Sequence, residues 1–171
     1  MPDICDNKSV GVIIKSGDRY AVIKRRNYPV AYTFVAGHLD GDTPEEAARK
    51  EAREEAGQAV LGSLEQKIGG LKLANPCRRE NGAWHEWYIF EANVPNTKLS
   101  AGSDAKEAFW TDRERLEKLI GRTHEFSKKL GLPIDDLTHF IPAVTSDPEW
   151  QKEPGFEPVW IVLLNTIGWT P

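Results

Sequence analysis

The hydrophobic positions of the chain fall into short runs separated by glycine, proline and other turn residues. Most of these runs are rich in β-branched and aromatic residues, which favour strands. Asn81-Gly82 is a strong hairpin-turn dipeptide, and residues 15–19 predict a hairpin turn between the first two runs. We therefore predict strands at 9–14, 20–23, 34–36, 59–61, 68–73, 84–94 and 104–110.

The segment between Thr43 and Gly57 predicts a helix with defined ends. Thr43 is a good N-cap, Pro44 suits the first helical position, and Glu46 completes a capping box with Thr43. Gly57 can adopt the left-handed conformation that ends a helix. The helix therefore spans the residues between these two signals.

Three glutamates share one face of this helix, because Glu51, Glu54 and Glu55 occupy positions i, i+3 and i+4. Like charges at this spacing cost about 0.2–0.5 kcal/mol per pair, and a divalent cation would remove that repulsion. Clustered carboxylate oxygens with room for water suit Mg²⁺ or Mn²⁺. The alternative, from these residues alone, is a solvated acidic face that neighbouring basic residues offset.

The later part of the chain predicts further helices. Thr111 and Glu114 form a capping box that opens a helix through Ile120, and a second helix covers 123–130. The apolar run 158–168 predicts a buried final helix, with a strand as the close alternative. Prolines break the intervening segment into turns: Pro142, Pro148, Pro154 and Pro158. Aromatic residues pack the final helix onto the sheet or onto a partner subunit of a homodimer: Trp150, Phe156 and Trp160.

The length of 171 residues suffices for a sizeable core and is most simply one domain, 1–171. Alternating strands and capped helices predict an α/β sandwich. We expect a core over about 9–120 and a mostly helical extension over about 121–171.

Composition and charge limit the partners of the chain. A net charge of −4 argues against stable nucleic acid binding, and no apolar run approaches the ~18 residues that span a bilayer. Cys5 and Cys77 lack a CxxC partner, which argues against a disulfide scaffold or a structural zinc site. Cys77 and His85 alone fall short of the donors that zinc needs. We expect free thiols and a cytoplasmic location.

Residues 37–58 resemble the Nudix box, the loop-helix-loop signature of the Nudix hydrolases, commonly written G-x5-E-x7-R-E-U-x-E-E-x-G-U with U a bulky aliphatic residue. Four residues rather than five separate Gly37 from Asp42, which stands at the first Glu position of the box. The matching positions are Glu51, Glu54, Glu55 and Gly57. The departures are Asp42 for the first Glu, Lys50 for Arg, and Ala52 and Gln58 for the aliphatic residues.

The resemblance implies a Nudix-type α/β/α sandwich with a mixed β-sheet. It implies that Glu51, Glu54 and Glu55 bind Mg²⁺ or Mn²⁺, with help from the carbonyl of Gly37. Lys50 keeps a charge able to fix Glu51 but lacks the planar fork of arginine. We take the three glutamates and Lys50 as the catalytic residues.

Basic and aromatic residues outside the box are candidates for binding the substrate. Arg25 lies at the basic end of the second strand, which often lies near the substrate in Nudix proteins. The alternative is that this is simply a charged strand end. Arg78, Arg79, Trp84 and Trp87 place guanidinium and aromatic groups near one turn, which suits the phosphates and base of a nucleotide. The alternative is that the tryptophans pack in the core and the arginines are solvated.

Some Nudix proteins take a further metal ligand or a general base from an acidic residue after the box. Glu86, Asp104 and Glu107 are the candidates for this role in the present chain.

These features predict a divalent-metal-dependent hydrolase that cleaves a diphosphate linkage in a nucleoside diphosphate derivative. No G-x-S-x-G or activated-cysteine signature for a covalent nucleophile is present. The small-molecule substrates left open are 8-oxo-purine triphosphates, ADP-ribose, dinucleoside polyphosphates and nucleotide sugars. The alternative function is a catalytically inactive Nudix-like nucleotide-binding or regulatory domain.

Overall fold

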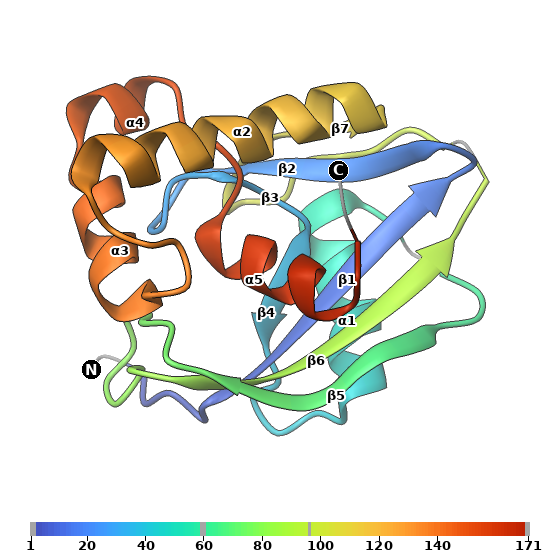
Figure 1. Cartoon of the computed structure of the whole chain (residues 1–171). Coiled ribbons are helices and arrows are strands. Elements are labelled where there is room, and N and C mark those ends of the chain that lie inside the picture. Colours follow the sequence, from blue (N-terminus) through green and yellow to red (C-terminus); the bar gives the residue numbers. More distant parts are fainter. Residues whose placement is uncertain (1–2, 59–60, 96, 170–171) are drawn as a thin grey trace.

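The computed structural model describes residues 3–58, 61–95 and 97–169. They form a mixed sheet with helices on both faces (Figure 1), which confirms the predicted α/β sandwich and its helical C-terminal region. The strands are β1 (Lys8–Ser16), β2 (Arg19–Arg25), β3 (Tyr32–Thr33), β4 (Val35–His38), β5 (Glu65–Leu73), β6 (His85–Asn93) and β7 (Ala105–Thr111). The helices are α1 (Pro44–Ala56), α2 (Arg113–Leu130), α3 (Leu137–Thr145), α4 (Pro148–Lys152) and α5 (Pro158–Thr166).

Strand β1 organises the sheet, whose order is β3-β2-β1-β6-β5, with β4 also paired to β1 and β7 to β2. The β1–β6 pair is parallel and the other pairs are antiparallel. Strand β2 pairs with the end of β1 at Lys15 and Ser16, whereas β4 pairs with residues 9–12 at its beginning. One edge of β1 is therefore shared by two strands, and β4 lies beside its first half.

Side chains of β1 point alternately into two cores, as expected for a strand that is buried on both faces. Val10, Val12 and Ile14 pack with residues of α1 in one core. Ile13 lies in the other core, with residues of α2, α3 and α5. Helix α1, which we call the box helix because it carries Glu51, Glu54 and Glu55, and the C-terminal helices therefore cover opposite faces of one sheet.

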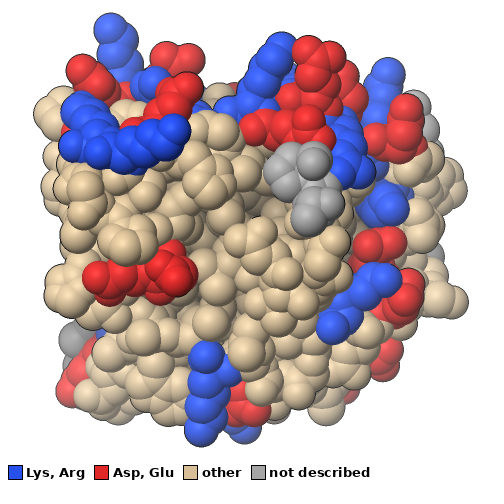
Figure 2. All heavy atoms as spheres, in the orientation of Figure 1, with Lys and Arg blue, Asp and Glu red and all other residues tan. Residues whose placement is uncertain are grey.

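The C-terminal helices pack onto the chain's own sheet, where Trp150, Phe156 and Trp160 are fully buried. The ring of Phe34 makes edge contacts with the rings of Phe156 and Trp160 at centroid distances of 5.0 and 5.1 Å. Helix α5 carries no charged residue. Figure 2 shows charged side chains gathered along the α2 edge of this face, while its centre is largely free of them.

Among the described residues, no helix has the length and apolar character needed to cross a bilayer.

Residues Arg113–Leu130 form one helix rather than the two that we predicted between Thr111 and Leu130. Thr111 is the last residue of β7, paired with Tyr20, so its backbone is extended and Asp112 becomes the N-cap instead. The Asp112 carboxylate accepts a hydrogen bond from the N–H of Arg115 at 2.8 Å. The helix continues through 121 and 122 because Ile120, Thr123 and Phe126 share one buried face.

Three further predictions of local structure differ from the structure. Pro142 lies inside α3 rather than in a turn, because the buried face of that helix, which includes Phe140 and Ile141, outweighs the missing N–H. Asn81-Gly82 forms a turn inside the long connection between β5 and β6 rather than a two-residue hairpin. In the predicted strand at 59–61, residues 59 and 60 lie outside the described residues, and Leu61 is not in a strand.

We expect the substitution Gly11→Ala to destabilise the fold. A Cβ on Gly11 would lie 2.5 Å from two ring atoms of Trp160 and 2.8 Å from Cδ1 of Ile89. Overpacking of a filled core costs about 1–3 kcal/mol, and urea unfolding should show a loss of that size. Gly121→Ala in α2 is the matched control, because nothing lies within 4 Å of its added Cβ. It should be neutral or stabilising by up to about 1 kcal/mol. Equal stability of the two variants would contradict this packing.

Candidate active site

Helix α1 begins and ends as predicted. The hydroxyl of Thr43 accepts from the N–H of Glu46 at 3.3 Å, and the Glu46 carboxylate accepts from the N–H of Thr43 at 3.0 Å. Gly57 ends the helix with φ of 71°. The side chains that α1 buries are all alanines: Ala47, Ala48, Ala52 and Ala56. Such small side chains let the helix lie close to the sheet, so that neighbouring glutamates reach the strands.

Two glutamates of α1 contact strand β4. The Oε2 atom of Glu55 accepts a hydrogen bond from the backbone N–H of Ala36 at 3.0 Å. The carboxylate of Glu51 lies directly against Gly37, where an added Cβ would overlap it. Glycine at 37 is therefore required for Glu51 to occupy this position.

Burial raises the pKa of both carboxyl groups. The pKa of Glu55 rises to about 8, chiefly through desolvation, while nearby Arg25 lowers it and Glu51 raises it. Desolvation and then the charge of Glu54 raise the pKa of Glu51 to about 7, while Lys50 lowers it. Both groups are partly protonated near neutral pH, and an added cation would favour their charged forms.

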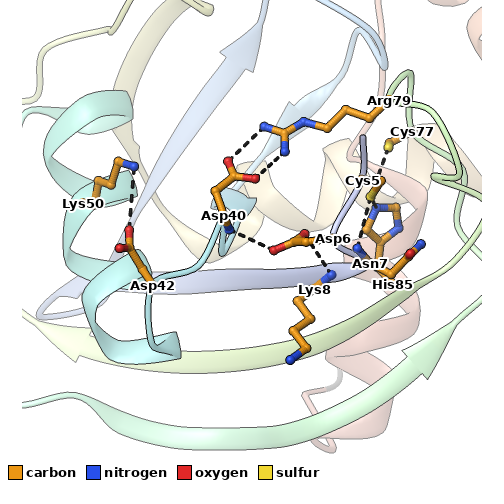
Figure 3. Close-up of polar contacts among 10 residues, drawn as sticks. All are labelled: Cys5, Asp6, Asn7, Lys8, Asp40, Asp42, Lys50, Cys77, Arg79 and His85. Atoms are coloured by element: carbon orange, nitrogen blue, oxygen red, sulfur yellow. Dashed lines mark hydrogen bonds and ion pairs between the residues drawn. The ribbon is translucent and has the colours of Figure 1, made fainter. Parts of the chain in front are cut away.

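The other two box residues in the predicted catalytic set lie toward solvent. Glu54 is exposed on α1, close enough to raise the pKa of Glu51. Lys50 forms an ion pair with Asp42, with Nζ 3.7 Å from Oδ2, as Figure 3 shows. Two departures from the box pattern therefore pair with each other, although such an exposed pair contributes only about 0–1 kcal/mol to stability.

A cavity of about 280 Å³ lies beside Glu51 and Glu55. Its lining combines carboxylates, which suit cations, with guanidinium groups, which suit phosphate oxygens. The predicted site residues that line it are Arg25, Gly37, Glu51, Glu55, Arg78, Arg79, Trp87 and Asp104. The structure thus brings together residues from six separate parts of the chain, in and around α1.

The arginines of the cavity are held by local contacts. Arg25 donates to the carbonyl of Tyr28 at 3.1 Å, and the guanidinium of Arg78 lies 5.0 Å from the centre of the Tyr28 ring. Arg79 makes two hydrogen bonds to the Asp40 carboxylate, one of 3.0 Å, and Figure 3 shows this pair. The Arg79 guanidinium holds the pKa of Asp40 below its ordinary value. Arg25 and Arg78 therefore keep more of their donors for a ligand.

The two predicted tryptophans have different environments. Trp87 is 5% exposed at the cavity wall, and its indole N–H donates to Oδ1 of Asn75 at 3.0 Å. Trp84 is 40% exposed, with the ammonium of Lys72 5.2 Å from its ring centre, and it is not among the described residues that line the cavity. Trp87 is thus mainly a core residue with one edge toward the site.

Of the three acidic residues predicted after the box, only Asp104 lines the cavity. Its carboxylate accepts from the side-chain amide of Asn27 at 3.1 Å. Glu86 accepts from the hydroxyl of Tyr88 at 3.2 Å, and Glu107 is exposed on β7. The geometry therefore brings Asp104 to the site and leaves the other two outside it.

Glu157, which sequence reasoning missed, also lines the cavity. It is 6% exposed, and its Oε2 atom is buried without a hydrogen-bond partner among the described residues. The backbone N–H of Glu157 donates to the carbonyl of Tyr32 at 2.8 Å, which fixes the start of α5 beside β3. The only sequence signal was an acidic residue directly before Pro158, which is too common to mark a site.

Comparison with known proteins places this geometry in context. A family model described as the NUDIX domain matches residues 6–131. The ADP-ribose pyrophosphatase of Methanocaldococcus jannaschii is 32% identical over 114 residues, which are 65% of this chain and 64% of that protein. The chain therefore spans just under two thirds of the length of this curated relative.

Solved structures show the same fold. The E. coli dihydroneopterin triphosphate pyrophosphohydrolase matches with a TM-score of 0.58 and 20% identity, covering 66% of this chain and 85% of that chain. The NUDIX domain of NrtR from Shewanella oneidensis, crystallised with ADP ribose, matches with a TM-score of 0.54 and 14% identity, covering 69% and 78%. At these identities the likeness concerns the fold alone.

We expect Glu55→Gln to reduce the pH dependence of stability in the metal-free protein. Folding raises the pKa of Glu55 from 4.5 to about 8, so the folded state binds an extra proton between these values. The free energy of unfolding should therefore fall as pH rises through this window, by at most about 1.4 kcal/mol per pH unit for one group. Glutamine keeps an acceptor for the N–H of Ala36 but does not ionise. Urea unfolding with a chelator present, from about pH 5 to about pH 8, measures the difference.

The matched control is Glu107→Gln on the exposed side of β7. It should keep the slope of the unsubstituted chain, to which Glu51 also contributes. If Glu55→Gln and Glu107→Gln show the same slope, Glu55 does not titrate as its burial requires.

Proposed function

The chain belongs to the Nudix family, and from this premise we propose that it is a hydrolase that cleaves a diphosphate linkage in a nucleoside diphosphate derivative, using Mg²⁺ or Mn²⁺. Nudix hydrolases generally use a divalent metal. The proposal is supported by a cavity that combines buried carboxylates with arginines beside the box helix. A small nucleotide is the kind of ligand that such a charge arrangement suits.

The observation that carries the proposal is the position of Glu51 and Glu55 beside Gly37. Two adjacent carboxyl groups with raised pKa values are unfavourable to ionise unless a cation lies near them. The absence of a side chain at Gly37 leaves room for the Glu51 carboxylate beside the backbone of β4. All donors here are oxygens, which Mg²⁺ and Mn²⁺ prefer, so the residues fit a hard divalent cation.

We assign metal binding to Glu51, Glu54 and Glu55, with the Gly37 carbonyl as a further donor. When bound, the metal would neutralise phosphate oxygens and lower the pKa of a water molecule. Lys50 acts through charge, because it lowers the pKa of Glu51 and so favours the carboxylate that binds the cation.

The basic side of the cavity binds the phosphates in this proposal. Arg25 and Arg78 are both anchored on Tyr28, by a hydrogen bond and by stacking, which orients them before a ligand arrives. Guanidinium groups bind phosphate oxygens with two parallel hydrogen bonds. Arg79 would bind a phosphate only by sharing its donors with Asp40.

Asp104 and Glu157 are the carboxylates that we propose to accept the proton of the attacking water. Both line the cavity with Glu51 and Glu55. Glu157 is the stronger candidate, because its Oε2 atom is buried and has no partner among the described residues, whereas Asp104 accepts from Asn27. An acceptor with a free lone pair in a partly dry site is suited to general-base catalysis.

ADP-ribose is the first substrate to test, because the relative from M. jannaschii is an ADP-ribose pyrophosphatase. The other Nudix-type substrates expected from the sequence belong in the same panel. The second candidate function, nucleotide binding without turnover, draws its support from the altered box positions Asp42 and Lys50, which pair with each other.

We expect hydrolysis of at least one member of a panel of ADP-ribose, 8-oxo-purine triphosphates, dinucleoside polyphosphates and nucleotide sugars when Mg²⁺ or Mn²⁺ is present. Chelation of the metal should abolish it. Glu51→Gln and Glu54→Gln should each lower kcat/KM by about 100-fold or more, since a metal site supplies several kcal/mol of charge stabilisation. Chromatography of the products, such as AMP and ribose 5-phosphate from ADP-ribose, provides the measurement.

Glu107→Gln is again the control and should retain the full rate, because Glu107 lies outside the cavity. If calorimetry shows that a panel member binds but none of the panel gives a product, the hydrolase proposal is wrong and nucleotide binding without turnover takes its place. Activity that survives Glu54→Gln would remove Glu54 from the metal site.

Glu157→Gln should lower kcat by about 10²–10⁴-fold with little change in KM, because it removes the proposed proton acceptor while keeping side-chain size. Asp104→Asn should have the smaller effect. If Asp104→Asn instead causes the larger loss of kcat, the two assignments are exchanged.

A further inference from the structure

Both cysteines of the chain and two of its four histidines meet in one cluster, and His38, Cys77 and His85 of this cluster line the cavity. The ligand atoms of Cys5, His38, Cys77 and His85 all lie within 4.8 Å of one another. Figure 3 shows the Cys77–Cys5–His85 part of this cluster. We propose that these four residues form a structural zinc site.

The spacing of the donor atoms is close to what zinc requires. A tetrahedral zinc with Zn–S of about 2.3 Å and Zn–N of about 2.0–2.1 Å places its two sulfurs about 3.8 Å apart and each sulfur about 3.6 Å from each nitrogen. The Sγ atoms of Cys5 and Cys77 are 3.8 Å apart, and Sγ of Cys5 is 3.2 Å from Nε2 of His85. These two distances lie within about 0.4 Å of the tetrahedral values, and all four donor atoms lie within 4.8 Å of one another.

The histidines present the nitrogens that a metal needs. Nδ1 of His85 lies 2.8 Å from the carbonyl of Asn75, so Nδ1–H donates there and the lone pair of Nε2 faces the cluster. Nε2 of His38 is buried without a hydrogen-bond partner among the described residues. A buried nitrogen without a partner is rare, and a metal ligand bond accounts for it.

The backbone around the two sulfurs holds them in place. The N–H of Cys5 donates to the carbonyl of Glu80 at 2.8 Å, and the N–H of Cys77 donates to the carbonyl of Gly82 at 2.7 Å. An added Cβ on Gly82 would overlap Sγ of Cys77. The Cys5 sulfur also accepts from the N–H of Asn7 at 3.3 Å, a contact that favours a thiolate. The turn is therefore shaped around the Cys77 sulfur.

Two other states of the cluster explain less. A Cys5–Cys77 disulfide would need the sulfurs to approach to about 2.05 Å, and it would leave Nε2 of His38 without a partner. A metal-free network of thiols and imidazoles leaves the same nitrogen unsatisfied. Two thiolates cancel the charge of Zn²⁺, so the occupied site is neutral, as its burial requires.

The donor set also separates this site from the proposed magnesium site. Two thiolates and two imidazoles in a tetrahedron select zinc, whereas carboxylate oxygens select Mg²⁺ or Mn²⁺. Four protein ligands leave no open position, so the ion is structural. It would tie the N-terminal segment and the loop at Cys77 to the ends of β4 and β6, and so position Arg78 and Arg79.

The test begins with the unsubstituted chain, purified with a reductant and without chelator. Elemental analysis should find about one zinc per chain. Replacement by Co²⁺ should give the intense visible bands of a tetrahedral ion and the near-ultraviolet charge-transfer band of cobalt thiolates. Removal of the zinc by a strong chelator should lower Tm, since binding of a structural zinc contributes to folding free energy.

Substitutions then assign the ligands. Cys77→Ser and His38→Gln should each reduce zinc content to background, and Cys77→Ser should also weaken the charge-transfer band of any cobalt retained. His124→Gln and His139→Gln, the two remaining histidines, both exposed, are the matched controls and should keep the zinc. Glu51→Gln should keep it as well, which separates this site from the proposed hydrolytic metal.

Three results would overturn the proposal. In the first, the unsubstituted chain binds neither zinc nor cobalt with its thiols reduced. In the second, the protein as isolated from cells contains a Cys5–Cys77 disulfide. In the third, no substitution in the cluster changes the zinc content. The first two need no variant, so they apply even if a substituted chain fails to fold. None of them depends on turnover, so this proposal and the hydrolase proposal fail independently.

Discussion

Partial burial of Glu51 and Glu55 against β4 is the constraint on which the rest of the site depends. Two carboxyl groups reach this position only because α1 packs on the sheet through alanines and because position 37 has no side chain. The caps at Thr43 and Gly57 fix where the helix begins and ends, and therefore which residues face β4. Desolvation raises the pKa of both carboxyl groups, so a nearby positive charge would stabilise their ionised forms. Family membership and local structure thus indicate the same chemistry.

The C-terminal region also contributes a side chain to this cavity, although its helices pack on the other face of the sheet. Helix α5 lies on the face opposite α1, yet Glu157, the N-cap residue before α5, reaches the same cavity because its N–H donates a hydrogen bond to the carbonyl of Tyr32. The rings of Phe156 and Trp160 on either side of Glu157 are fully buried against Phe34. A side chain between two such anchors has little freedom to move. The extension therefore contributes to the cavity wall as well as to the core.

The sequence predicted those helices and strands whose signals lie within a few residues of one another. The capping box, the glutamate spacing and the β-branched runs each specify structure within a few residues, and α1 and most strands formed as expected. Prediction failed where tertiary contacts decide. Because Thr111 pairs with Tyr20 in the sheet, the N-cap of α2 is Asp112 instead, and packing keeps Pro142 inside α3. Glu157 and the four-residue cluster had no local pattern, because their partners lie far away along the chain; Cys5 and Cys77 are 72 positions apart.

Strand β4 shows why the two metal proposals concern separate sites that share a wall. Successive residues of a strand point to opposite sides, so Gly37 faces Glu51 while His38 faces the ring of His85, whose centre is 5.3 Å away. Oxygen donors therefore gather on one side of β4 and sulfur and nitrogen donors on the other. Each group matches a different class of cation, hard on the first side and softer on the second. A zinc ion bound to His38 would restrain the backbone of the neighbouring Gly37. The cluster would therefore help to hold the strand against which Glu51 and Glu55 pack.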